Sequence, residues 1–130
     1  MSPLFDAHSH LEGSLGPPDM LQVVCGTCEG DWEAVLAHAA SEPRVLPMLG
    51  LHPWRVAEAA PGWLGRLEAL LVDHRVGVGE CGLDFARKDS DRGAQMLAFR
   101  QQLRLARCLE RPVALHVVRA WGPCLDLLRE

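Results

Sequence analysis

The chain has 130 residues, which is the length of one modest domain. Hydrophobic residues make up 48 % and charged residues 23 %, a balance typical of globular proteins. The formal charge of −4 argues against a protein that binds nucleic acid through a broad basic surface. It does not exclude an enzyme that meets phosphate through metal ions, because the ions bring their own positive charge.

The sequence also restricts where the protein is expected to work. Its first residues are no secretory signal peptide, because they lack a basic start and a sustained apolar run. No stretch approaches the roughly 20 apolar residues of a membrane-spanning helix. Five cysteines are an odd number outside any obvious extracellular framework. We therefore expect reduced thiols, a cytoplasmic location and no membrane partner.

Short apolar runs alternate with amphipathic stretches along the chain. Each apolar run is short enough for a buried strand. Strands are predicted at Leu4–Ala7, Met20–Cys25, Val45–Leu51, Val76–Gly79 and Val113–His116. Between them, Asp31 is predicted as the N-cap of a helix, Pro61 opens a second, residues 91–109 form a third, and a last helix begins near Trp121.

Strands separated by helices are typical of βαβ units with a parallel sheet. A complete (β/α)8 barrel has eight of each in about 250 residues. The pattern therefore predicts an α/β fold with about the first five strands of a TIM-type barrel, and residues 1–130 as one apparently truncated domain. A half barrel leaves strand edges and an apolar face uncovered, so pairing of two half barrels is a further expectation.

His8 and His10 come at the end of the first apolar run. In an extended segment, residues two apart point to the same side, so both imidazoles can reach one metal ion. Asp6 has the same parity and could ligate the ion or orient a histidine. By itself the pair is weak evidence, and a polar strand end without a ligand explains it equally well.

Glu80 and His116 end two later apolar runs. Active sites of parallel barrels lie at the carboxyl ends of the strands, so both side chains would face the same mouth. Singly, each is more often a solvated acid or a satisfied histidine. Together with His8 and His10 they bring nitrogen and oxygen ligands from three strands to one end of a sheet, a combination that suits a hydrolytic metal site.

Four segments, in this order and spacing, resemble the TatD family of metal-dependent hydrolases in the amidohydrolase superfamily. They are FDAHSHL at 5–11, GLHPW at 50–54, GECGLDF at 79–85 and PVALH at 112–116. Further matches to the family's helix pattern are Gln95, Phe99, Gln102, Leu105 and Ala106. The resemblance implies a barrel that binds two divalent ions, magnesium first, with manganese or zinc as alternatives.

The resemblance also implies roles for individual residues. His8 and His10 would hold the first ion, the catalytic Glu80 would bridge both, and His116 would hold the second. Family members are similar to deoxyribonucleases that cleave phosphodiester bonds, often from 3′ ends, so DNA is the expected substrate.

His52 and Asp84 are expected to contact substrate or to support the ligands. For His52, a loop histidine fixed by the following Pro53 is an equally good interpretation. The family also has a later histidine and a later aspartate, on strands beyond residue 130, that complete its metal site. No residue here obviously replaces either, so an inactive, non-catalytic fragment is an open alternative.

Other functions remain open as well. Cys25 and Cys28 form a C-x-x-C pair that is typical of thiol redox or zinc sites, although no second pair follows. Amidohydrolases that split C–N or ester bonds, including deacylases of mischarged tRNA, are another alternative. Those that split C–N bonds typically carry a carboxylated lysine at the fourth strand, whereas this chain has Glu80 there and its one lysine, Lys88, outside the strand.

Overall fold

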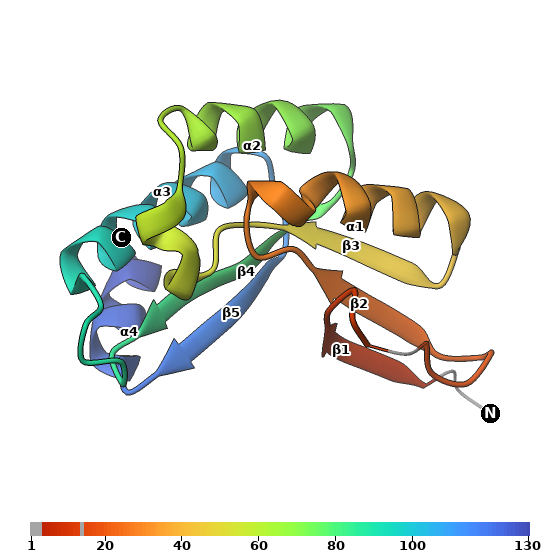
Figure 1. Cartoon of the computed structure of the whole chain (residues 1–130), viewed down its shortest axis with the longest axis horizontal. Coiled ribbons are helices and arrows are strands. Elements are labelled where there is room, and N and C mark those ends of the chain that lie inside the picture. Colours follow the sequence, from red (N-terminus) through yellow and green to blue (C-terminus); the bar gives the residue numbers. More distant parts are fainter. Residues whose placement is uncertain (1–3, 14) are drawn as a thin grey trace.

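The computed structural model describes residues 4–13 and 15–130. Five parallel strands form one sheet whose spatial order is the order of the chain (Figure 1). The strands are β1 (Phe5–Ser9), β2 (Leu21–Cys25), β3 (Val45–Leu49), β4 (Gly77–Asp84) and β5 (Val113–Val118). The predicted five-stranded parallel sheet is therefore confirmed.

Helical segments connect successive strands from β2 onward, and α1, α2 and α3 lie along one side of the sheet in Figure 1. They are α1 (Glu29–Ser41), the short 3-10 helix η1 (Pro53–Glu58), α2 (Trp63–Asp73) and α3 (Arg92–Cys108), and a last helix, α4 (Trp121–Arg129), follows β5. The sequence pattern did not predict η1. Within the described ranges, no helix is long and apolar enough to cross a membrane.

The hydrophobic core lies between the sheet and its helices. Leu67 of α2, Val78 of β4 and Phe99 of α3 are completely buried in it. Leu67 and Leu71 lie four residues apart on α2, so one helix face carries both into the core. Burial of these large side chains is the main favourable contribution to folding, roughly 1.5–3 kcal/mol for each.

The two ends of the sheet differ in burial. All eight residues of β4 are buried, whereas none of the five residues of β1 is. In the part of the chain that the structure describes, β1 pairs with β2 alone. Phe5 of β1 is 56 % exposed. The strand that carries His8 is thus the least covered of the sheet.

The first helix begins earlier than predicted. Its N-cap is Cys28 and its first residue is Glu29, so the prediction of Asp31 as N-cap is wrong. The Asp31 carboxylate still satisfies free backbone donors, because it accepts hydrogen bonds from the N–H groups of Thr27 at 2.9 Å and Cys28 at 3.3 Å. It does so from the third position of the helix, which sequence pattern alone does not separate from the cap.

The fourth strand ends later than predicted. The expected strand ended at Gly79, but β4 continues to Asp84, so Glu80 lies inside it. Gly79 and Gly82 have φ angles of 147° and 148°, which side chains rarely tolerate. A Cβ atom at Gly79 would lie 2.7 Å from the carbonyl oxygen of Ala114, and one at Gly82 would collide with the carbonyl of His116. The two glycines therefore let β5 approach β4 closely.

Candidate metal centre

Glu80 is the centre of the site, and this residue is buried, with 4 % of its surface exposed. One oxygen, Oε2, lies 3.0 Å from Nε2 of His8 and 3.2 Å from Nε2 of His10. The other, Oε1, lies 3.0 Å from Nδ1 of His116 and 3.8 Å from Nε2 of His52. The two oxygens thus face two different groups of histidines, as a carboxylate that bridges two ions would.

The hydrogen bonds of His10 determine which ring nitrogen is free. Its Nδ1 lies 3.1 Å from the carbonyl oxygen of Cys25, a pure acceptor, so Nδ1–H donates this bond. In the neutral ring, Nε2 then carries a lone pair, and it points at Glu80 and at Nε2 of His8, which is 3.2 Å away. Both imidazoles remain accessible, with side chains 39 % exposed for His8 and 43 % for His10.

His116 is oriented in the same way by Asp84. Its Nε2 lies 2.9 Å from Oδ2 of Asp84, so Nε2–H donates to the carboxylate and Nδ1 keeps the lone pair that faces Glu80. Burial raises the pKa of Asp84, but hydrogen bonds from His116 and from the indole of Trp54 outweigh burial and hold this pKa below its usual value. Asp84 therefore stays ionised and keeps the His116 ring in place.

His52 has the opposite pattern. Its Nδ1 accepts the backbone N–H of Trp54 at 3.1 Å, so the neutral ring carries its proton on Nε2. Burial, opposed by Glu80 and assisted by His116, lowers the pKa of His52 to about 4. His52 is thus a neutral donor whose Nε2–H points toward Nδ1 of His116, 3.2 Å away.

These residues fit divalent metal ions. His8, His10 and Glu80 form one group of possible ligand atoms within 4.8 Å of one another, and His52, Glu80 and His116 form a second. In the first group His10 directs the lone pair of Nε2 at Glu80, and in the second His116 directs the lone pair of Nδ1 at Glu80, an arrangement that a cation would stabilise. By distance His52 belongs to the second group, but its proton on Nε2 makes it a donor instead of a ligand.

Two buried glutamines hold the backbone next to the site, a role that the sequence reasoning missed. Gln102 accepts the N–H of Leu51 at 2.8 Å and donates to the carbonyl of the same residue at 3.2 Å. Gln95 makes the same pair of bonds with Asp84, at 2.8 and 3.1 Å. A polar residue on the apolar face of the third predicted helix was the available signal. The two amides fix the chain beside His52 and at Asp84.

The remaining sequence candidates lie outside the ligand groups. The carboxylate of Asp6 accepts the backbone N–H of His8 at 3.1 Å and contacts neither ring nitrogen of that histidine. All five cysteines are free, and burial together with the charge of Glu80 raises the pKa of Cys25 to about 12. A thiol that stays protonated is a poor redox group. Lys88 lies in the loop between β4 and α3 and not beside Glu80.

Comparison with known proteins identifies relatives. The sequence profile of the family described as "TatD related DNase" matches residues 16–130. The 3′-5′ ssDNA/RNA exonuclease TatD of Cronobacter sakazakii is 38 % identical over 104 residues, and this alignment covers 79 % of the chain and 40 % of the relative. The same enzyme of Erwinia tasmaniensis is 39 % identical over 85 residues, covering 62 % and 31 %. TATDN3 of Mus musculus is 31 % identical over 156 residues, covering 98 % and 52 %.

A solved structure agrees with the fold. The crystal structure of YJJV, a TatD homologue from Escherichia coli K12, matches with a TM-score of 0.88 and 26 % identity. The match covers 98 % of this chain and 56 % of YJJV, so the chain spans little more than half the length of that neighbour. The five strands are those of a partial (β/α) barrel, as the sequence predicted.

Proposed function

The chain belongs to the family of TatD-related DNases. On this basis we propose that it functions as a metal-dependent hydrolase that cleaves phosphodiester bonds in nucleic acid. The observation that carries this proposal is the shared carboxylate of Glu80, with one oxygen toward His8 and His10 and the other toward His116. The relatives named as exonucleases act on single-stranded DNA and RNA. We take DNA, attacked from its 3′ end, as the substrate.

Two divalent ions are the proposed cofactors. His8, His10 and Glu80 would hold the first, and Glu80 with His116 would hold the second. Bound ions would polarise the phosphodiester and neutralise the charge that develops during hydrolysis. Magnesium is the first ion to test, and manganese and zinc follow because imidazole ligands favour them.

His52 and Asp84 have proposed supporting roles that differ. The donor Nε2–H of His52 is suited to an oxygen of the substrate phosphate, since the ring is neutral and its other nitrogen is occupied by the N–H of Trp54. Asp84 acts through His116, whose free nitrogen it keeps directed at Glu80. His52 would therefore bind substrate, and Asp84 would position a ligand.

Residues 1–130 are proposed to form the N-terminal half of a barrel, because the chain spans 56 % of its structural neighbour. Two partly exposed strands agree with this assignment: β1 carries Phe5, 56 % exposed, and β5 carries Leu115, 37 % exposed. Further strands or a second half barrel would cover them, and sedimentation velocity at several concentrations tests self-association. The cytoplasmic location stays a prediction, supported by the five free thiols and testable by cell fractionation.

The central experiment measures release of nucleotides from 3′-labelled single-stranded DNA by the purified chain with magnesium, with manganese and with EDTA. We expect metal-dependent release that falls by more than about a hundredfold in Glu80→Gln, because both groups of ligands lose their shared charge. The matched control is Glu58→Gln, which removes a charge from the exposed end of η1. Release that survives Glu80→Gln would contradict the proposal, and a folded chain without release would assign activity to a longer or paired form.

A further inference from the structure

Trp54 is a half-exposed aromatic side chain beside the candidate metal centre. It is 52 % exposed, yet its position is fixed. The indole Nε1–H donates to Oδ2 of Asp84 at 2.7 Å, and the ring meets the edge of His52 with centroids 5.2 Å apart. A large ring held in one orientation and still open to solvent loses little conformational entropy when a ligand covers it.

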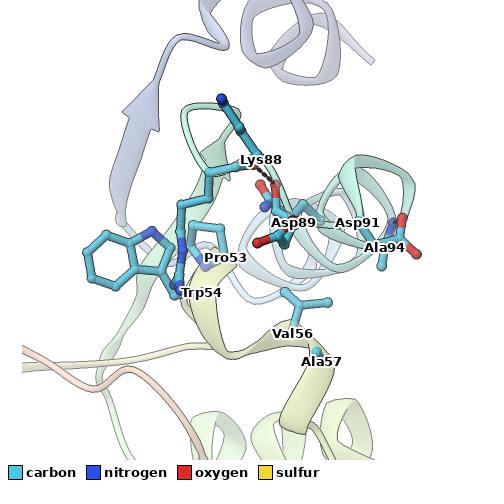
Figure 2. Close-up of a pocket in the computed structure, with 11 residues that line it drawn as sticks. Pro53, Trp54, Val56, Ala57, Lys88, Asp89, Asp91 and Ala94 are labelled. Carbon is cyan, nitrogen blue, oxygen red and sulfur yellow. Dashed lines mark hydrogen bonds between the residues drawn. The ribbon is translucent and has the colours of Figure 1, made fainter.

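This indole lies between two neighbouring pockets. One has a volume of about 580 Å³ and contains His10, His52 and Glu80 of the metal centre. The other, of about 460 Å³, lies between η1 and the loop that joins β4 to α3 (Figure 2). Both volumes are in the range of small-ligand sites, roughly 300–1,000 Å³. A ligand with its phosphate at the metal centre can therefore extend past Trp54 into the second pocket.

The wall of the second pocket contains a cationic side chain, Arg87, that lies over the ring of Trp54. The guanidinium carbon of Arg87 lies 5.1 Å from the centroid of the Trp54 ring. Arg87 is itself exposed, and Lys88 follows it in the same wall. Single-stranded nucleic acids are held by this combination, because bases stack on indole rings and on guanidinium planes while the positive charge attracts phosphate.

From this geometry we infer that Trp54 and Arg87 form a nucleobase-stacking subsite for the unpaired nucleotide next to the phosphate at the metal centre. The inference rests on the proposed function for the identity of that phosphate. Every base has a π-face, so the subsite takes any base and confers no sequence preference. A base inside a duplex is already stacked on its neighbours, so the subsite selects single strands.

Trp54 also supports the metal centre through Asp84, and the test separates the two roles. Trp54→Leu removes both the ring face and the hydrogen bond to Asp84. Trp54→Phe keeps a ring face and removes only the bond. Arg87→Met removes the cation and leaves Trp54 untouched. Arg104→Met, on the exposed side of α3, loses the same charge and is the matched control.

The experiment compares two fluorescein-labelled hexathymidylates by fluorescence anisotropy in EDTA, where no cleavage occurs. One carries all its bases, and the other has abasic tetrahydrofuran residues at its last three positions. We expect the wild-type chain to bind the intact strand about tenfold more tightly, the order of one base stacked on an aromatic residue. Trp54→Phe and Arg104→Met should keep most of this preference, Arg87→Met should reduce it, and Trp54→Leu should abolish it.

Equal affinity of the wild-type chain for both strands would overturn the inference, as would a preference that Arg87→Met and Trp54→Leu leave intact. Circular dichroism of each variant verifies that it folds. A base preference without metal-dependent release would leave the subsite standing and refute the proposed hydrolysis by this chain. Metal-dependent release together with equal binding of both strands would support the proposed hydrolysis and refute the stacking subsite.

Discussion

His8 belongs to β1, an edge strand that is nowhere buried, and His10 follows the last residue of this strand, whereas Glu80 and Asp84 belong to β4, in which every residue is buried. Beyond its pairing with β2, β1 is tied down by few contacts, such as the hydrogen bond from Ser9 Oγ to the carbonyl of Val23 at 2.8 Å. The β4 side is packed under α3 and clamped at Asp84 by Gln95.

This difference indicates how the site is divided. The β4–β5 side is arranged by the core of the fold, so its geometry does not depend on a ligand. The β1 side has little tertiary packing, so ligand binding is what would order it.

Hydrogen exchange should show the contrast most strongly. We expect backbone amides of β1 to exchange about a thousandfold faster than those of β4, because edge segments open locally while buried strands open only with global unfolding. Mass spectrometry of peptides that cover Phe5–Ser9 and Gly77–Asp84 measures both rates. The control is β2, an interior strand that should exchange as slowly as β4. Manganese should slow β1 selectively, and equal protection of β1 and β4 in EDTA would contradict the division.

Loss of a glutamine clamp should destabilise the buried side. Gln102→Leu leaves the N–H and the carbonyl of the buried Leu51 without partners, at a cost of about 1–3 kcal/mol for each group. We expect the free energy of unfolding in urea to fall by roughly 2–5 kcal/mol. Gln101→Leu, at the preceding and only partly buried residue of the same helix, should change it by less than about 0.5 kcal/mol. Similar losses in both variants would show that the clamp contributes nothing.

Asp84→Asn should weaken one group of ligands and spare the other. An amide at this position no longer fixes the proton of His116 on Nε2, so affinity at the His116 side should fall about 10–100-fold. Isothermal titration with manganese should show weaker binding in the phase that belongs to His116, while the phase that belongs to His8 and His10 stays unchanged. The control is Asp89→Asn, an exposed acid in the following loop. Unchanged affinity in Asp84→Asn would mean that His116 is oriented by other contacts.

The smallest effect is expected at the exposed edge. Phe5→Ser should lower the free energy of unfolding by about 0.5 kcal/mol or less, because the ring is 56 % exposed. Phe99→Ala, in the completely buried position on α3, should cost about 3–5 kcal/mol. Urea titrations at two protein concentrations compare them. A large cost of Phe5→Ser that grows with concentration would show that a second copy covers β1.

Much of the fold could be predicted because it depends on local pattern. Apolar runs and helical periodicity give the five strands and four α-helices, with a large error only at the end of β4, which continues to Asp84. The spacing of His8 and His10 predicts both rings on one side of an extended segment. In the structure, the Nε2 atoms of the two rings lie 3.2 Å apart. Such features need only neighbours along the chain.

What escaped prediction depends on partners far away in sequence. Gln102 bonds Leu51, 51 residues earlier, and Trp54 bonds Asp84, 30 residues later. The proton on Nε2 of His52 follows from a single backbone N–H, that of Trp54, which no residue pattern reveals. Glu80 was expected at a strand end because the apolar run stops there, but β4 continues to Asp84 and Glu80 lies inside it.

Those two glycines have a consequence for how β4 tolerates variation. If every position of the strand were randomised and functional chains selected, the strictest requirement would fall on Gly79 and Gly82, which carry no chemical group. Any side chain there would push the carbonyls of Ala114 and His116 away and carry the imidazole of His116 from Glu80. Alanine at either position should therefore be tolerated less well than conservative changes at many residues that touch the site directly.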